Sequence, residues 1–193
     1  MRSPDNRSAC RAEIRISEGN AGLEPIKKNS PAKRAALLGI LCALAVALSF
    51  LEGLLPSLPV PGARLGLSNI VTMFALSTPG LGLPAALVIT LAKALFALLR
   101  GGTAFFMSLS GGLLSTLVMA LAWRVFRRRL SFVGIGVLGA IAHNGGQLGA
   151  AMLLLGPALL AYAPWLLLAA LFAGAATGIT LNVVMPALER MNI

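Results

Sequence analysis

Residues 35–55 read AALLGILCALAVALSFLEGLL, an apolar run in which Glu52 is the single charged side chain. A helix needs about 20 apolar residues to cross the hydrocarbon core of a bilayer, and this run meets that length. Charged residues make up 11% of the chain, whereas soluble domains carry roughly a quarter. After Arg34 the only carboxylates are Glu52 and Glu189. A soluble domain could not hydrate its surface with so little charge, so the sequence predicts an all-α integral membrane protein.

Further apolar segments follow the first, and together they predict a polytopic bundle of six transmembrane helices. The second segment is short, and Pro79 and Gly80 follow it. We expect this segment either to continue through Leu81–Leu83 or to lie tilted and partly covered by its neighbours, with a re-entrant piece as the alternative. The expected spans are residues 35–55, 65–78, 81–99, 105–126, 132–155 and 158–188.

The distribution of Lys and Arg predicts the orientation of these spans. With six spans and the N-terminus inside, the cluster at residues 124–129 and Arg190 fall on the cytoplasmic side, and only Arg64 and Arg100 fall outside. Without the second span, the same cluster would move to the outer face, against the positive-inside rule. We therefore expect both termini in the cytoplasm of a bacterial cell and the protein in its plasma membrane.

Residues 1–33 are polar, mixed in charge and interrupted by Pro and Gly, which predicts a disordered basic cytoplasmic tail ahead of a membrane domain at 34–193. The apolar run after this tail lacks a small-residue cleavage site, so we expect no signal peptide. Cys10 and Cys42 suggest no disulfide framework. The net charge of +10 lies in the tail and at helix ends without interleaved aromatic residues, which argues against nucleic acid as a partner.

Polar residues inside the expected spans gather at similar depth, in the outer half of the bilayer or near its middle. Each is costly there and marks a candidate functional site. Arg64, Lys93 and Arg100 against Glu52 leave an excess of positive charge, which suits a small anionic solute such as a carboxylate or phosphate ester. The loop 56–69, with its prolines, would then be an outer lid. The candidate solute-binding residues are Glu52, Arg64, Asn69, Lys93, His143, Asn144 and Gln147.

Structural explanations exist for the same residues. His143 and Gln147 are spaced i and i+4 and share one helix face, so they could form interhelical hydrogen bonds instead of binding a solute. Arg100 has the position of an interfacial anchor, and Lys93 has the depth to pair with Glu52. Gly145 and Gly146 would let a neighbouring helix or a ligand approach the backbone closely.

Small residues recur at every fourth position of the first span, which places them in one line along the helix. Such a line lets another helix approach closely. It indicates either packing within the bundle or a docking face for a separate membrane subunit. Its members are Ala35, Gly39, Ala43 and Ala47.

The sequence lacks the motifs of several chemical functions. No Walker A sequence is present, so ATP hydrolysis by this chain is excluded. Asp5 is the single aspartate, and no Cys/His cluster suggests a metal site or another cofactor. Chemistry on a diphosphate normally needs Mg²⁺ held by carboxylates. We therefore do not expect an enzyme in this chain by itself.

Three motifs resemble a known family, the Gx transporter family, also called heptaprenyl diphosphate synthase component I, over about residues 35–188. They are PGARLGLSNIVTMFAL (61–76), SLSGGLLSTLVMAL (108–121) and GAIAHNGGQLGAAMLL (139–154). One departure is Lys93, which stands where the family pattern has an arginine in the third helix.

This resemblance implies a six-helix bundle with an outward-facing pocket, similar to the substrate-binding components of energy-coupling-factor transporters. Such a component docks on an energising membrane subunit with two ATPases, and the small-residue line resembles its docking face. The alternative is a non-catalytic membrane subunit that presents or anchors a soluble prenyltransferase in polyprenyl diphosphate synthesis.

Overall fold

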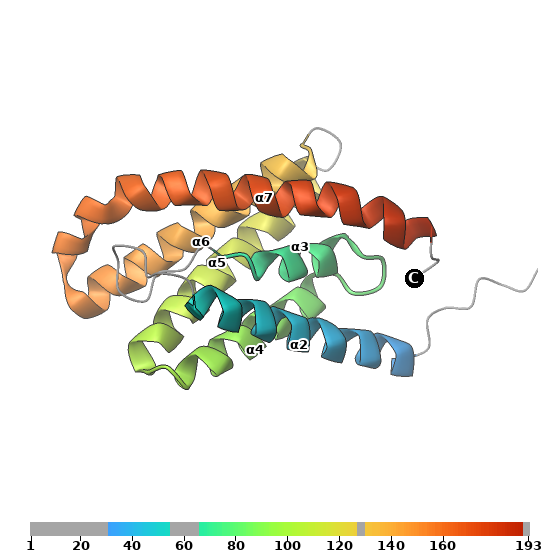
Figure 1. The fold of residues 1–193 in the computed structure, drawn as a ribbon, viewed down its shortest axis with the longest axis horizontal. Coiled ribbons are helices and arrows are strands. Elements are labelled where there is room, and N and C mark those ends of the chain that lie inside the picture. Colours follow the sequence, from blue (N-terminus) through green and yellow to red (C-terminus); the bar gives the residue numbers. More distant parts are fainter. Residues whose placement is uncertain (1–30, 55–65, 127–129, 191–193) are drawn as a thin grey trace, which may run out of the picture.

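The structure, a computed structural model, describes residues 31–54, 66–126 and 130–190, with side chains through residue 186. In this part of the chain all regular structure is helical (Figure 1). The elements are α2 (Pro31–Leu54), α3 (Asn69–Ser77), α4 (Gly82–Leu98), α5 (Gly102–Phe126), α6 (Phe132–Leu155), the 3₁₀ helix η1 (Pro157–Tyr162) and α7 (Ala163–Arg190).

Helix boundaries follow local chemistry. Pro31 is the first residue of α2, where its missing N–H costs nothing and its fixed φ suits the helix. Ser131 precedes α6 in an extended conformation, and its side chain accepts a hydrogen bond from the Val133 N–H at 3.4 Å. Gly156 ends α6 with φ 111°, a conformation that other residues rarely adopt. Most of the predicted tail lies outside the described residues.

Helix α3 corrects one expectation. It ends at Ser77 and does not continue through Leu81–Leu83, because Thr78 is extended ahead of Pro79 and Gly80 has φ 91°. At 1.5 Å per residue, its nine residues span roughly 14 Å, half of the hydrocarbon thickness. The expected cover by neighbours is confirmed, since five of the nine residues are buried: Asn69, Val71, Thr72, Met73 and Ala75.

The long helices run side by side with their connections at two opposite ends (Figure 1). The start of α2, the turn between α3 and α4, and the end of α7 lie at one end. The α4–α5 turn and the connection from α6 to α7 lie at the other. At the first end, the guanidinium of Arg34 lies 3.4 Å from the position of a Cβ on Gly80. Helix α3 therefore starts inside the bundle and runs toward the end that holds the start of α2.

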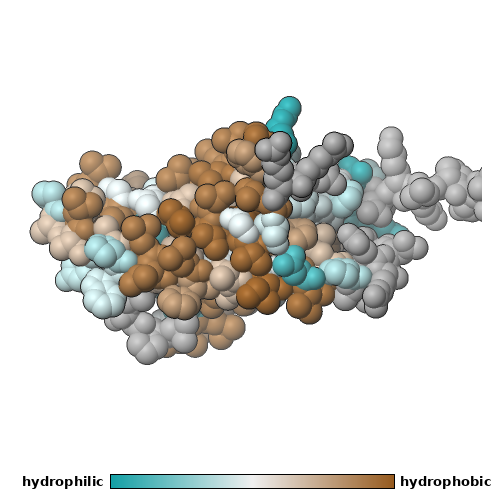
Figure 2. Space-filling model, turned by 90° about the horizontal axis from the view of Figure 1, so that it is seen from above, coloured by the Kyte–Doolittle hydropathy of each residue, from teal (hydrophilic) through white to brown (hydrophobic). Residues whose placement is uncertain are grey.

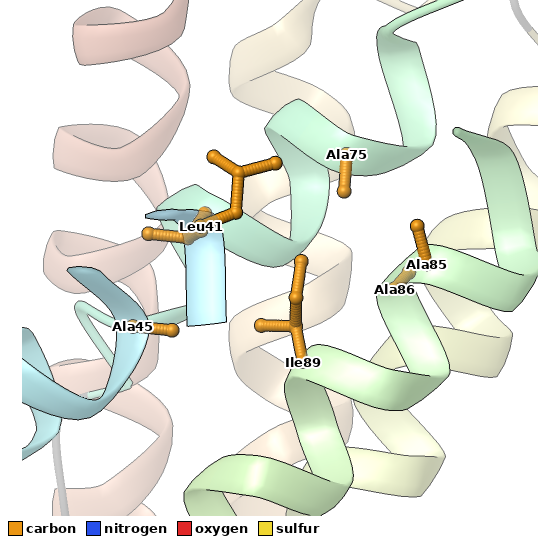
Figure 3. Close-up of a cluster of buried hydrophobic side chains, with 7 residues drawn as sticks. Leu41, Ala45, Ala75, Ala85, Ala86 and Ile89 are labelled. Atoms are coloured by element: carbon orange, nitrogen blue, oxygen red, sulfur yellow. The ribbon is translucent and has the colours of Figure 1, made fainter. Parts of the chain in front are cut away.

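An apolar core holds α3 between α2 and α4. Figure 3 shows Leu41 and Ala45 from α2 facing Ala75 of α3 and Ile89 of α4. All four are 5% exposed or less. Burial of these side chains fixes the position of α3, and with it the depth of the helix start.

The outer surface is apolar, as expected in a bilayer. Large hydrophobic side chains such as Leu99, Leu153 and Phe172 are more than three-quarters exposed, and hydrophobic residues cover the middle of the face in Figure 2. By length and composition, three of the described helices could cross a membrane: Pro31–Leu54, Gly102–Phe126 and Pro157–Pro186. Gly82–Leu98 is a shorter apolar helix. Helix α6 is long enough but carries His143, Asn144 and Gln147.

Candidate functional site

Polar side chains from four helices meet inside the bundle around the start of α3. All are buried, with exposed fractions of 8% or less. We call this group the polar cluster, and its members are Glu52 from α2, Ser68, Asn69 and Thr72 at the start of α3, Lys93 from α4, and His143 and Gln147 from α6.

Lys93 ties α4 to the first turn of α3. Its Nζ donates hydrogen bonds to Asn69 Oδ1 at 3.1 Å and to the Ser68 and Thr72 hydroxyls at 3.4 Å each. Asn69 and Thr72 are spaced i and i+3, so both side chains point to one side of the helix. A buried ammonium group requires such partners, because its desolvation is otherwise costly. All three partners are neutral, so the charge of Lys93 is solvated but not neutralised by them.

Glu52 occupies the N-terminal end of α3. Its Oε1 accepts a hydrogen bond from the backbone N–H of Ser68 at 3.2 Å. Ser68 precedes the helix, and its own side chain makes no capping hydrogen bond. A carboxylate is favourable there because the first N–H groups of a helix carry partial positive charge. The expected pairing of Glu52 with Lys93 takes an indirect form, in which both bind Ser68, one at its N–H and the other at its hydroxyl.

His143 and Gln147 complete the cluster from α6. Their side chains lie 2.9 Å apart, Nε2 to Nε2, so this hydrogen bond joins residues of one helix and not two helices. His143 also approaches the loop before α3. A Cβ on Gly66 would lie 3.2 Å from His143 Cδ2 and 3.0 Å from Asn69 Nδ2. With φ 81° and this crowding, glycine at residue 66 is what allows His143 and Asn69 to come together.

The cluster contains hydrogen-bonding atoms without partners in the described residues. They include Asn69 Nδ2 and His143 Nδ1. His143 Nδ1 lies against α5, 3.3 Å from the position of a Cβ on Gly111. An unsatisfied buried polar group costs about 1–3 kcal/mol. Asn69 Nδ2 therefore has hydrogen-bonding capacity that no described residue uses.

Asn144 lies on a different side of α6 from the cluster. Its Nδ2 donates to the Leu166 carbonyl of α7 at 2.8 Å. This is an interhelical hydrogen bond of the kind weighed above as a structural role. The structure therefore separates Asn144 from His143 and Gln147, although the three are close in sequence.

The remaining charged candidates lie elsewhere. Arg64 is outside the described residues. Arg100 is exposed after the end of α4, with its guanidinium carbon 5.8 Å from the centre of the Phe96 ring. Cation–π contact at an exposed position suits an interfacial anchor. Arg100 is thus at the rim and not in the cluster.

The small-residue line lies on the outside of α2. All of its members are exposed, and nothing lies within 4 Å of a Cβ position on Gly39. The bundle instead contacts the opposite face of α2, which carries Leu41, Ala45, Ser49 and Glu52. Packing against the described helices is therefore not the use of Ala35, Gly39, Ala43 and Ala47.

Sequence reasoning missed several residues that shape the site. Gly66 and Ser68 belong to the loop 56–69, but no sequence periodicity distinguishes them from their neighbours. Thr90 and Thr116 form a buried hydroxyl pair at 2.8 Å between α4 and α5, one turn from Lys93 along α4. Their signal was weak because threonine is common in apolar helices, where its hydroxyl bonds the preceding turn, as Thr90 does with the Ala86 carbonyl. Within the described ranges, no three His, Cys, Asp or Glu side chains come together to hold a metal ion.

Comparison with known proteins gives one match. The profile of a family described as heptaprenyl diphosphate synthase component I matches residues 41–184, which include α3, α4, α5 and α6 in full. No curated protein and no solved structure matches the chain significantly.

Proposed function

The chain belongs to the heptaprenyl diphosphate synthase component I family, also called the Gx transporter family, and we propose that it captures a small anionic solute from the outer side of the membrane. In this role it is a transporter component similar to the substrate-binding components of energy-coupling-factor systems. The observation that carries the proposal is the polar cluster, in which a buried lysine lies beside polar atoms that have no partner in the described part of the chain.

The chemistry of the cluster supports an anion. Polar groups in the membrane interior are costly and are retained where they pair with one another or bind a ligand. Asn69 Nδ2 and His143 Nδ1 make no hydrogen bond within the described residues, which leaves bonding capacity for a ligand in the cluster. Lys93 supplies a positive charge whose hydrogen-bond partners are neutral, and Glu52 lies close enough to interact with it electrostatically. A carboxylate or phosphate group would accept from Asn69 Nδ2 and would replace one of the neutral acceptors of Lys93.

For the membrane topology we propose six crossings with both termini in the cytoplasm. The start of α2 and the end of α7 lie at the same end of the bundle, in support of this count (Figure 1). In a background without Cys10 and Cys42, single cysteines at Gly102 and Pro157 should react with an impermeant reagent from outside. A cysteine at Arg128 should react only after permeabilisation, and its labelling in intact cells would refute the six-span topology.

The partner in this proposal is an energising membrane subunit with ATPases. The exposed small-residue line on α2 supports it, since close helix contact needs small side chains on an open face. The chain itself carries no ATP-binding motif, so uptake driven by ATP would depend on such a partner.

The family description favours a second candidate, a membrane subunit associated with polyprenyl diphosphate synthesis. After Arg34 the sequence holds two carboxylates, Glu52 and Glu189. That is too few for the Mg²⁺ sites of diphosphate chemistry. In this case the chain would anchor or present a soluble prenyltransferase and would not catalyse the reaction.

Purification from the native membrane separates the two candidates. The tagged full-length protein is extracted in mild detergent, and its co-purifying proteins and small molecules are identified by mass spectrometry. ATPases together with a bound anion support the transporter component. A soluble prenyltransferase without ATPases supports the second candidate and contradicts the first.

A further inference from the structure

The start of α3 is arranged as an anion site inside the bundle. Helix N-termini attract anions because their first N–H groups have no partner within the helix. Here the N–H groups of Asn69 and Ile70 are satisfied by the carbonyls of Gly66 and Leu67 at 2.9 and 3.0 Å. The N–H of Ser68 instead points at the Glu52 carboxylate. Backbone donors just before α3, of Ser68 and also of Leu67, are therefore held by a group from another helix.

Two side-chain donors flank the Ser68 N–H. Asn69, 4% exposed, directs Oδ1 to Lys93 and leaves Nδ2 without a partner in the described residues. Lys93 lies against the same turn through the Ser68 hydroxyl. If Glu52 moved away, the Ser68 N–H would join Asn69 Nδ2 as a donor for an anionic group, beside the positive charge of Lys93.

From this arrangement we infer that Glu52 is an internal substitute for the solute, and that the carboxylate or phosphate of an incoming solute displaces it from the Ser68 N–H. The inference rests on the proposed function, since it names how the same site works. Two anionic groups cannot share one donor set without strong repulsion in a buried site. The solute must therefore either exclude Glu52 or bind elsewhere.

Displacement would also connect the site with α2. Glu52 lies near the end of α2, and its hydrogen bond reaches across to α3. When the solute takes the Ser68 N–H, α2 loses that bond. The same helix carries the exposed small-residue line, so occupancy of the site changes how firmly the proposed docking helix is held.

The test compares Glu52→Gln with wild type in anion titrations of the full-length protein in detergent. Inorganic phosphate and succinate are the probes, at constant ionic strength, with binding followed by calorimetry. Glutamine keeps an acceptor for the Ser68 N–H but removes the competing charge. We expect Glu52→Gln to bind at least one probe about tenfold more tightly than wild type. Glu189→Gln, which removes the same charge elsewhere in the sequence, should bind as wild type does.

Asn69→Asp provides an independent arm. Aspartate retains a partner for Lys93, so the fold should persist, but it replaces the Nδ2 donor with an anionic oxygen. We expect affinity to fall by about tenfold or more. Suppose that the wild-type protein binds a probe. If Glu52→Gln then binds it equally or more weakly, or if Asn69→Asp binds it as wild type does, Glu52 is not a substitute for the solute. The proposed function would still stand. Absence of binding in all variants, combined with native protein that carries no anion, would overturn both.

Discussion

Helices are held together differently in two regions of the molecule, the contact between α6 and α7 and the polar cluster. At the first, glycines let the backbones touch: a Cβ on Gly136 would lie 2.5 Å from the Gly174 carbonyl oxygen, and one on Gly174 would lie 2.5 Å from Val137 Cα. At the second, charged and amide groups lie between the helices, and some of their atoms have no partner among residues 31–54, 66–126 and 130–186. Helices in a bilayer associate chiefly through close packing. The glycine contact thus holds α6 against α7 by packing alone, whereas polar groups join α2 and α4 to the start of α3.

Substitution at the glycine contact should have the largest effect on stability. Gly174→Leu forces a side chain into the backbone of α6, and overpacking of this kind costs about 1–3 kcal/mol or more. We expect little monodisperse protein in detergent and a clearly lower melting temperature. Gly149→Leu is the control, because nothing lies within 4 Å of its Cβ position. Equal melting of the two variants would show that this contact does not hold the bundle together.

In the cluster, substitution should affect binding more than stability. His143→Ala and Gln147→Ala remove a hydrogen bond within α6, and the first also removes the unpartnered Nδ1. We expect solute binding or uptake to weaken by about tenfold or more while melting of the empty protein barely moves. Lower stability with unchanged binding would assign both residues a structural role and refute their part in the site.

Asn144 lies on the same helix as His143 and Gln147 but outside the cluster, so its substitution should affect stability and not binding. Asn144→Leu removes the hydrogen bond to the Leu166 carbonyl of α7. Such bonds in membranes average under about 1 kcal/mol, so we expect a small decrease in melting temperature and normal solute binding. A loss of binding as large as that of His143→Ala would place Asn144 in the site after all.

The smallest effect on the isolated protein is expected at the small-residue line. Ala43 is exposed on α2, so Ala43→Leu should leave melting and solute binding unchanged. Added bulk should nevertheless block a close helix contact with a partner. The measurement is co-purification with the energising subunit, beside Leu44→Ala as an exposed neighbour that removes bulk. Normal recovery of the partner with Ala43→Leu would exclude this line as the docking face.

Most helix positions could be predicted from the sequence because apolar runs and Gly/Pro interruptions dominate it. The predicted span 132–155 coincides with α6, and 105–126 ends at the last residue of α5. The length of α3 could not be fixed in this way. The sequence of an apolar segment does not show whether the segment crosses the bilayer or begins inside a bundle. In addition, the end of α3 at Ser77 depends on the conformation of Thr78 and Gly80.

For the site, depth could be predicted but partners could not. The sequence placed Glu52, Asn69, Lys93, His143 and Gln147 at similar depth, and the structure brings them together around α3. It could not separate Asn144 from its neighbours, because rotation of α6 against α7 is set by the glycine contacts. It also could not find Ser68, whose role depends on its backbone N–H and not on its side chain alone.

The measurement that tests the central claim most directly is anion binding by Lys93→Met beside Arg100→Met. Each variant removes one positive charge, from the buried cluster and from the exposed rim, respectively. Titration uses the anion identified in the native protein, or inorganic phosphate. Hydrogen bonds to charged groups contribute about 1.5–3 kcal/mol, so Lys93→Met should bind about ten- to a hundredfold more weakly than wild type. Arg100→Met should bind nearly as wild type does. Wild-type affinity in Lys93→Met would contradict a solute site at the start of α3.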